Sequence, residues 1–296
     1  MLDDTLKKAL ISFFFLISCQ HEPAALTLNE IDYGIELAQK GELHDAKKTL
    51  LLALETKPHD TKLHKEIGHI YYKLHEYNLA KKHLDLVAHD LDPTSHFILG
   101  ECDRSQDRYH QAIKHYKMSL SQSFHLDTMR SLAWSYYKIK DFDQALKYTL
   151  KMKDHNRQDV TSYIIQAQIY MTMKELKTAQ RVLEVGFTQV KEEFHPYLQK
   201  NLADLALLRQ DYKVAFTLYQ KVLRQYPMLA SGHLGLGRVY LKFKDLKKAS
   251  LHLEKAILLD PTLKERVASL HEISKLNPTL TQYLKKKKRH LTEYQF

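Results

Sequence analysis

A small apolar position recurs along the chain at a nearly constant spacing. Seven alanines occupy it, separated in turn by 34, 32, 33, 34, 36 and 34 residues: Ala46, Ala80, Ala112, Ala145, Ala179, Ala215 and Ala249. Twelve residues before each alanine stands a second small residue: Gly34, Gly68, Gly100, Ala133, Ala167, Ala203 and Gly237. Such periods are typical of repeat proteins, whose units cannot bury an apolar face alone and share a core with their neighbours. The pattern therefore predicts one repeated unit over most of the chain.

Other positions of the repeat follow the same phase. Seven residues after each alanine stand Ala53, Val87, Ser119, Met152, Gly186, Val222 and Ala256, of which four are small. Nine residues before it, four repeats have a tyrosine: Tyr71, Tyr136, Tyr170 and Tyr240. Closing prolines are Pro58, Pro227 and Pro261, with Pro93 one position late. With these positions the chain resembles the tetratricopeptide repeat family, whose period is about 34 residues.

This resemblance implies an all-α fold, a right-handed superhelical solenoid of about seven tetratricopeptide helix pairs. The small number of chain breakers, 8 glycines and 7 prolines, also favours helices. The expected repeats cover 27–263, as 27–60, 61–92, 93–125, 126–159, 160–195, 196–229 and 230–263. A C-terminal capping helix is expected over 264–284, because Val267, Leu270, Ile273 and Leu276 form one apolar stripe. A basic tail, 285–296, follows, which we interpret as a solvated end; the alternative is a second contact with anionic headgroups.

The amino terminus is typical of an exported protein. Lys7 and Lys8 precede an apolar segment, 9–18, that is too short to span a bilayer. It ends in Leu-Ile-Ser-Cys at 16–19, which resembles the bacterial lipoprotein signal. That resemblance implies a signal peptide, 1–18, and a mature chain that begins at a lipidated Cys19, with 19–26 as its tether. Asp3 and Asp4 cancel the charge of the two lysines, so an unprocessed start on a cytosolic protein stays open as an alternative.

Charge bears on the partner and not on the fold. Lysine and arginine (45) exceed aspartate and glutamate (35), which gives a net charge of +10 and favours acidic partners. Two cysteines cannot form a disulfide framework, so packing must stabilise the chain. Gln20 follows Cys19, and in lipoproteins an aspartate there commonly retains the protein at the inner membrane. The resemblance thus favours the outer membrane, facing the periplasm, over the inner membrane.

In tetratricopeptide repeats the first helix of each pair lines a groove, mainly through positions 2, 5, 9, 12 and 13. Carried over, those positions hold nine bases and three acids, an excess of six positive charges. The implied partner-binding residues are Lys62, Lys65, His69, Tyr72, Lys73, Phe97, Arg104, Arg130, Trp134, Tyr137, Lys138, Tyr197, Lys200, Arg238 and Lys242, and the acids are Glu101, Asp127 and Asp204. The resemblance implies an electropositive groove for an extended acidic peptide or a carboxyl terminus. Alternatively, the bases only keep the chain soluble, and some aromatic rings are wedged between helices.

One known mode of the family is not expected here. Some members hold the terminal carboxylate of a chaperone with lysine, asparagine and arginine. Lys65 matches the first lysine, but His69 replaces the asparagine, and Asp204 interrupts a partial match at Lys200 and Asn201. The departures argue against a chaperone-tail adaptor.

Catalytic, metal and cofactor sites are not expected. The 18 histidines include close pairs such as His64 with His69 and His110 with His115, but a spacing of five places the rings on different faces of a helix. The stretch 232–237 resembles a phosphate loop but lacks the preceding strand and the following lysine. Cys102 has no matched histidine, and we interpret it as a packed thiol.

The combined expectation is a lipid-anchored, non-enzymatic scaffold that binds proteins in the cell envelope and assists pilus or envelope-complex assembly. In plan it is similar to the pilotin lipoproteins of type IV pili, and also to adaptors of wall hydrolases and to the repeat lipoprotein of outer-membrane barrel assembly. The alternative is a cytosolic adaptor that binds protein or, as a weaker choice, RNA. Nucleic acid is not the expected partner, because export would separate the protein from nucleic acid in the cytosol. Partner identity and oligomeric state stay open.

Overall fold

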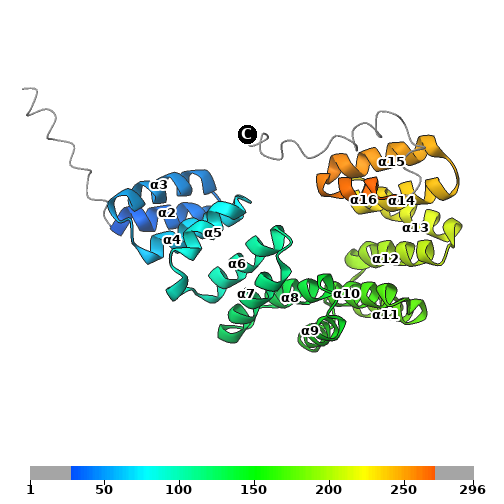
Figure 1. Ribbon diagram of the computed structural model, residues 1–296, viewed down its shortest axis with the longest axis horizontal. Helices are drawn as coiled ribbons and strands as arrows, with labels where there is room; N and C mark the ends of the chain where they lie inside the picture. Colours follow the sequence, from blue (N-terminus) through cyan, green and yellow to red (C-terminus); the bar gives the residue numbers. More distant parts are fainter. Residues whose placement is uncertain (1–27, 271–296) are drawn as a thin grey trace, which may run out of the picture. The chain divides into compact units, whose positions relative to one another are not determined.

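The structure is a computed structural model that describes residues 28–270. Within this range the chain forms fifteen α-helices and three short 3-10 helices, without a strand (Figure 1). The chain divides into two compact units, one ending at Ile139 and the other beginning at Lys140. Inside residues 28–270, no helix combines the length and apolar character needed to cross a bilayer.

The first unit is a series of consecutive helices that alternate between first and second members of a pair. Its helices are α2 (Leu28–Lys40), α3 (Leu43–Thr56), α4 (Thr61–Lys73), α5 (Tyr77–Asp85), α6 (Pro93–Ser105), α7 (Tyr109–Gln122) and α8 (Leu126–Lys138), with the 3-10 helix η1 (Ala88–Asp90) after α5. The expected repeat 126–159 spans the unit boundary, because its first helix, α8, ends the first unit.

The second unit continues the alternation. Its helices are α9 (Phe142–His155), α10 (Val160–Thr172), α11 (Leu176–Gln189), α12 (His195–Leu208), α13 (Tyr212–Gln225), α14 (Ala230–Lys242), α15 (Leu246–Leu259) and α16 (Lys264–Ala268), with the 3-10 helices η2 (Glu192–Phe194) and η3 (Pro261–Leu263). Here α10 packs on α11, α12 on α13 and α14 on α15, and each pair contacts the next.

The repeating small residues lie where the helices pack. All seven anchor alanines have an exposed fraction of 0%. The seven small residues twelve positions earlier are also buried. At Gly68 an added Cβ would lie 2.8 Å from Leu84 Cγ, and at Gly237 it would lie 2.8 Å from Leu253 Cγ. The sequence pattern therefore marks the points of closest helix approach.

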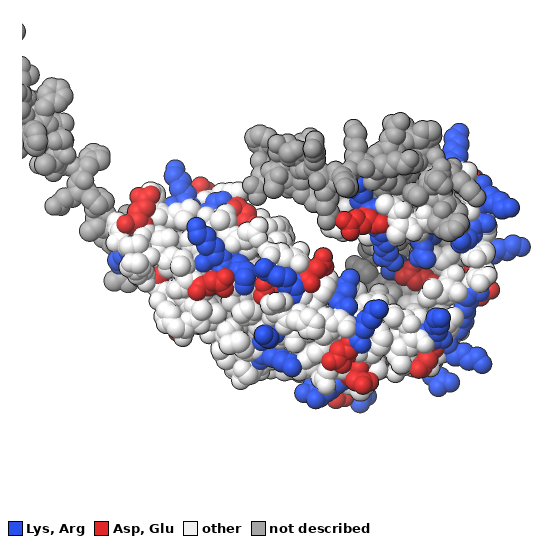
Figure 2. All heavy atoms as spheres, in the orientation of Figure 1, with Lys and Arg blue, Asp and Glu red and all other residues white. Residues whose placement is uncertain are grey.

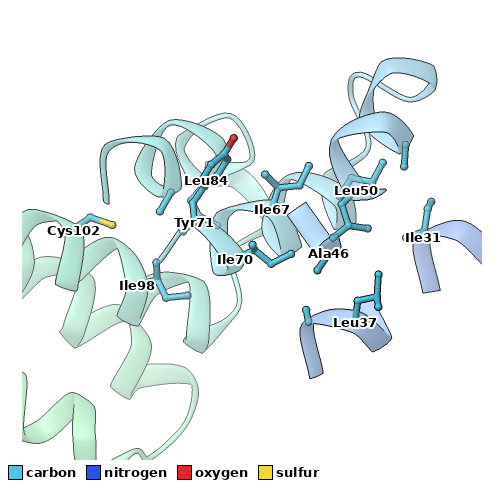
Figure 3. Close-up of a cluster of buried hydrophobic side chains, with 14 of the residues drawn as sticks. Ile31, Leu37, Ala46, Leu50, Ile67, Ile70, Tyr71, Leu84, Ile98 and Cys102 are labelled. Carbon is cyan, nitrogen blue, oxygen red and sulfur yellow. The ribbon is translucent and has the colours of Figure 1, made fainter. Parts of the chain in front are cut away.

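Each core is shared by neighbouring pairs. In the first unit one apolar cluster runs through five helices, from Ile31 and Leu37 on α2 to Ile98 and Cys102 on α6 (Figure 3). Cys102 is fully buried, which raises the pKa of its thiol to about 12, as a packed and unreactive thiol requires. In the second unit three clusters join successive pairs in the same way. This sharing confirms the stacking that the repeat predicts.

The turn inside each pair has one conformation throughout. A residue with positive φ, between 57° and 86°, stands five positions before every anchor alanine: Gly41, His75, Asp107, Lys140, Lys174, Gln210 and Lys244. The following N–H bonds back to a carbonyl of the first helix, as Glu175 N to Tyr170 O at 2.8 Å. This bond is typical of the Schellman ending of a helix. All seven residues therefore hold a left-handed conformation that favours glycine, and six of them are not glycine.

The described range ends in a short helix at the start of the segment that is expected to form the cap. Helix α16 covers only Lys264–Ala268, and Val267 is fully buried in the cluster of α14 and α15, together with half-buried Leu263 and Leu270. The remainder of the expected capping helix, 271–284, and the basic tail, 285–296, lie outside the described residues. So do the expected signal, 1–18, and the tether with Cys19.

The left-handed conformation of the non-glycine turn residues predicts that a glycine there stabilises the fold. Lys174→Gly should raise the free energy of unfolding by about 0.5 to 1 kcal/mol, because relief of the left-handed strain exceeds the added entropy of the unfolded chain. Arg181→Gly, on an exposed position inside α11, should lower it by about 1 kcal/mol. Urea unfolding of both variants measures this. A destabilised Lys174→Gly variant would contradict the turn assignment.

Candidate functional site

The first helices of successive pairs form a continuous surface in each unit, which we call the first-helix surface. In the first unit α4 contacts α6 and α6 contacts α8, and in the second unit α10 contacts α12 and α12 contacts α14. All fifteen predicted groove residues lie on these first helices: Lys62 to Lys73 on α4, Phe97 and Arg104 on α6, Arg130 to Lys138 on α8, Tyr197 and Lys200 on α12, and Arg238 and Lys242 on α14.

Most of these side chains are only partly accessible. Lys62, Lys73, Lys138, Tyr197 and Lys242 are exposed, and the other ten are half-buried. A partner could therefore contact five of them without any rearrangement. The half-buried side chains can take part only through the atoms that reach the surface.

Intramolecular carboxylates pair with five of the nine bases predicted for the groove. Lys65 Nζ lies 2.9 Å from Asp90 Oδ2, and Lys200 Nζ lies 2.7 Å from Asp204 Oδ2. Ion pairs also join Lys62 to Asp32, Arg104 to Glu101 and Arg130 to Asp127. Figure 2 likewise shows Asp and Glu side chains interspersed among Lys and Arg on the visible face. Glu101, Asp127 and Asp204 are already subtracted in the predicted excess of six positive charges, and Asp32 and Asp90 are the two further acids that lower it.

Glu101 is the centre of a buried network on α6, with an exposed fraction of 7%. Its Oε1 accepts hydrogen bonds from Tyr116 Oη at 2.6 Å, Ser131 Oγ at 2.7 Å and Arg104 Nε at 3.1 Å. Burial alone would raise the pKa of Glu101, but the bonds from Arg104, Tyr116 and Ser131 outweigh it and keep the pKa below its ordinary value. The carboxylate is therefore charged at neutral pH and joins α6, α7 and α8.

The second unit contains the same arrangement. Tyr219 Oη donates to Asp204 Oδ1, and each tyrosine follows its acid by 15 residues. Both rings occupy space left by a glycine: an added Cβ would lie 2.4 Å from Tyr116 at Gly100 and 2.2 Å from Tyr219 at Gly235. Two predicted groove acids therefore bind to the protein itself and are not available to a partner.

The predicted aromatic residues divide into two groups. Tyr72 and Phe97 have ring centroids 6.3 Å apart and pack against the apolar cluster of the first unit. Burial raises the pKa of Tyr72 to about 12. Trp134 and Tyr137 form a separate pair at 5.2 Å, and Lys138 Nζ lies 5.5 Å from the Trp134 ring centre. The Trp134 pair with its lysine is the stronger candidate for contact with a partner, since its rings are not part of that cluster.

His69 joins two first helices. Its Nε2 lies 3.0 Å from Ser95 Oγ on α6, and burial lowers the pKa of His69 below its ordinary value. The ring is therefore neutral at neutral pH and adds no positive charge to the surface. Its position favours a structural role in the contact of α4 with α6.

Two histidine pairs are features that the sequence reasoning missed. His64 Nδ1 lies 3.0 Å from His83 Nδ1, and His233 Nδ1 lies 2.9 Å from His252 Nδ1. In each pair the first ring also contacts a backbone carbonyl, of Pro58 or Pro227, through Nε2. A carbonyl only accepts, so Nε2 carries the proton and the bare Nδ1 accepts from the second histidine. The signal was available, because both pairs are 19 residues apart at the same positions of the repeat.

A third pair at the same spacing, His96 and His115, has ring centroids 6.0 Å apart. Their Nδ1 atoms are buried without a hydrogen-bond partner among the described residues.

Across residues 28–270, no three histidine, cysteine or acidic side chains are grouped to hold a metal ion. Gly232, Gly235 and Gly237 lie inside α14, so the stretch 232–237 is helix and not a phosphate loop.

Comparison with known proteins agrees with the fold. Residues 187–262 match the sequence model of the tetratricopeptide repeat family. A tetratricopeptide repeat protein from Parabacteroides merdae has a similar structure, with a TM-score of 0.71 and 16% identity over 86% of this chain and 97% of that one. PilF of Pseudomonas aeruginosa is similar at a TM-score of 0.53 and 19% identity over 73% of this chain and 96% of that one.

A third similar structure is PilW, a widely conserved type IV pilus biogenesis factor. Its TM-score is 0.54 at 12% identity, over 67% of this chain and 92% of that one. At these identities the likeness shows the fold. The chain therefore has the tetratricopeptide repeat fold, and the expected all-α architecture of consecutive packed helix pairs is confirmed.

The histidine pairs make folding stability depend on pH. Burial, then the neighbouring histidine and a lysine, lowers the pKa of His83 and of His252 from 6.5 to about 4. Between those values the unfolded chain binds more protons than the folded one, so stability is complete above pH 6.5 and falls as pH decreases toward 4. One pKa unit corresponds to at most about 1.4 kcal/mol, and solvent reduces that at half-buried rings.

Urea unfolding at several pH values measures this loss. The His83→Gln/His252→Gln variant should lose less stability than the wild type between pH 6.5 and 4. The control is His59→Gln/His110→Gln, which changes two exposed histidines, and its stability should depend on pH as that of the wild type does. Equal pH slopes in all three proteins would contradict the neutral pairs.

Proposed function

We propose that the protein is a membrane-anchored scaffold that binds protein partners in the bacterial cell envelope and assists assembly of a pilus or another envelope complex. The observation that carries the binding role is the first-helix surface, where the exposed Lys138 lies over the Trp134 ring, which pairs with Tyr137. Tetratricopeptide folds are generally scaffolds without enzymatic activity, and we propose the same here.

Binding is expected to centre on bases that the protein does not neutralise itself. Within residues 28–270 neither Lys73 nor Lys138 forms an ion pair with a carboxylate, whereas Lys65, Arg104 and Lys200 do. Lys138 instead lies over Trp134 and, at 5.9 Å, over Tyr109. An acidic, extended segment with apolar side chains complements this part of the surface, and such charges mainly add specificity and association rate.

Anchoring rests on the sequence before the described residues. The apolar segment 9–18 and Ser18-Cys19 support acylation of Cys19, and Gln20 supports the outer membrane. Two or more acyl chains give stable attachment, whereas a single chain is marginal. The seven residues 20–26 span at most about 25 Å, so the helix pairs would meet partners close to the bilayer.

Pilus assembly is the first pathway to examine. PilW is described as a pilus biogenesis factor, and it shares the fold of this chain. This likeness supports a comparable scaffold role without identifying the partner.

Intact-mass measurement of the membrane fraction tests the anchored scaffold. The expected product begins at Cys19, carries added acyl mass and leaves the membrane fraction when Cys19→Ala is introduced. Ser18→Ala keeps a small residue before the cysteine and is the matched control, which should still be processed. An unmodified chain that begins at Met1 in the soluble fraction would contradict the proposal and favour the cytosolic adaptor.

A further inference from the structure

A second candidate site lies in the second unit, away from the predicted groove residues. It is a depression of about 280 Å³ among α13, α14 and α15, which are consecutive in the fold (Figure 1). Its chemistry comes from two bases, two histidines and an apolar floor: Arg224, Lys255, His233, His252, Leu223 and Leu236.

The two bases in this depression have no carboxylate partner among the residues that the structure describes. Within residues 28–270, neither Arg224 nor Lys255 forms an ion pair, and no acidic residue is among those that line the depression. This differs from the first-helix surface, where Lys65, Arg104 and Lys200 each have one. An uncompensated pair of positive charges in a concave site attracts an anionic group.

The histidines contribute shape and hydrogen bonding without charge. Burial lowers the pKa of His233 and brings that of His252 to about 4, so both rings are neutral at neutral pH. Because His252 donates through Nδ1 to His233, its Nε2 stays an acceptor. At neutral pH the positive charge of the depression therefore comes from Arg224 and Lys255.

The apolar part indicates what else the ligand must contain. Both leucines belong to the lining, Leu236 buried and Leu223 half-buried, and Met228, in the loop beside Pro227 of the lining, is 68% exposed. Sites for drug-sized molecules usually exceed about 300 Å³, so this volume suits one or two side chains of a larger partner. A free phosphate would leave the leucines and Met228 without a contact.

We propose that this depression binds a protein partner through an acidic side chain that sits between Arg224 and Lys255, with a neighbouring apolar side chain against Leu223 and Leu236. None of the residues that line the depression is a predicted groove residue, so it would be a site separate from the first-helix surface. It would give the scaffold a second contact point, and two linked contacts bind more tightly than either alone.

Fluorescence anisotropy with the purified full-length chain tests this. The probe is a fluorescein-labelled peptide of alternating glutamate and leucine, and its counterparts replace glutamate by glutamine or leucine by serine. Arg224→Gln/Lys255→Gln should raise the Kd of the glutamate–leucine peptide about tenfold or more, since each charged contact is lost. The control, Lys221→Gln/Lys247→Gln, removes the same charge from exposed positions of α13 and α15 and should change Kd less than about twofold.

Further arms separate the sources of binding. The glutamine and serine peptides should both bind more weakly than the glutamate–leucine peptide. The proposal would be overturned in favour of unspecific attraction if Arg224→Gln/Lys255→Gln and Lys221→Gln/Lys247→Gln lost the same affinity for the peptide. It would also be overturned if the serine peptide bound as tightly as the glutamate–leucine peptide. Retained peptide binding in Arg224→Gln/Lys255→Gln would overturn it as well. If binding to phosphatidylglycerol vesicles required these two bases and peptide binding did not, the site would instead be assigned to contact with a membrane surface.

Discussion

The close approach of the two helices in each pair is the constraint on which the other features depend. Glycine or alanine on the first helix and the anchor alanine on the second are buried in all seven repeats. At Gly34 and Gly68 even a methyl group would come within 3.0 Å of the facing leucine. Successive first helices also contact one another, α4 with α6 and α6 with α8, and they form the surface proposed to bind partners.

The same constraint explains the polar contacts inside the helix layers. Two second helices have a tyrosine where others have the facing leucine: Gly100 on the paired helix α6 leaves room for Tyr116, and Gly235 on α14 of the next pair leaves room for Tyr219. Each hydroxyl reaches an acid on its own paired helix, Glu101 or Asp204. Leaving such an acid buried without a partner would cost several kcal/mol, so the tyrosine and the nearby base stabilise both helices. For function, this means that several bases already pair with internal carboxylates. The net positive charge of the surface is therefore smaller than its number of bases suggests.

The fold was predictable from the sequence because helix pairing depends on small residues at regular positions. Ala46 to Ala249 establish the repeat, and Gly34 to Gly237 confirm its phase. The left-handed turn residues were not predictable in this way, because only Gly41 among them is a glycine and the others conform to the packing. The placement of the candidate residues on first helices was predictable. Sequence position places Lys65 and Lys138 on the same surface, yet the partner of Lys65 is Asp90 in a connecting segment, 25 residues away.

Charge reversal on the first-helix surface tests most directly whether partners bind there. The wild type, Lys73→Glu/Lys138→Glu and Lys82→Glu/Lys114→Glu would be cross-linked in membranes of the native host, and the adducts quantified by mass spectrometry. Lys82 and Lys114 are exposed on the second helices α5 and α7, so they carry the same charge change elsewhere in the first unit. The account predicts that adducts fall about tenfold with Lys73→Glu/Lys138→Glu and persist with the control. Equal adduct yields in all three proteins would contradict it.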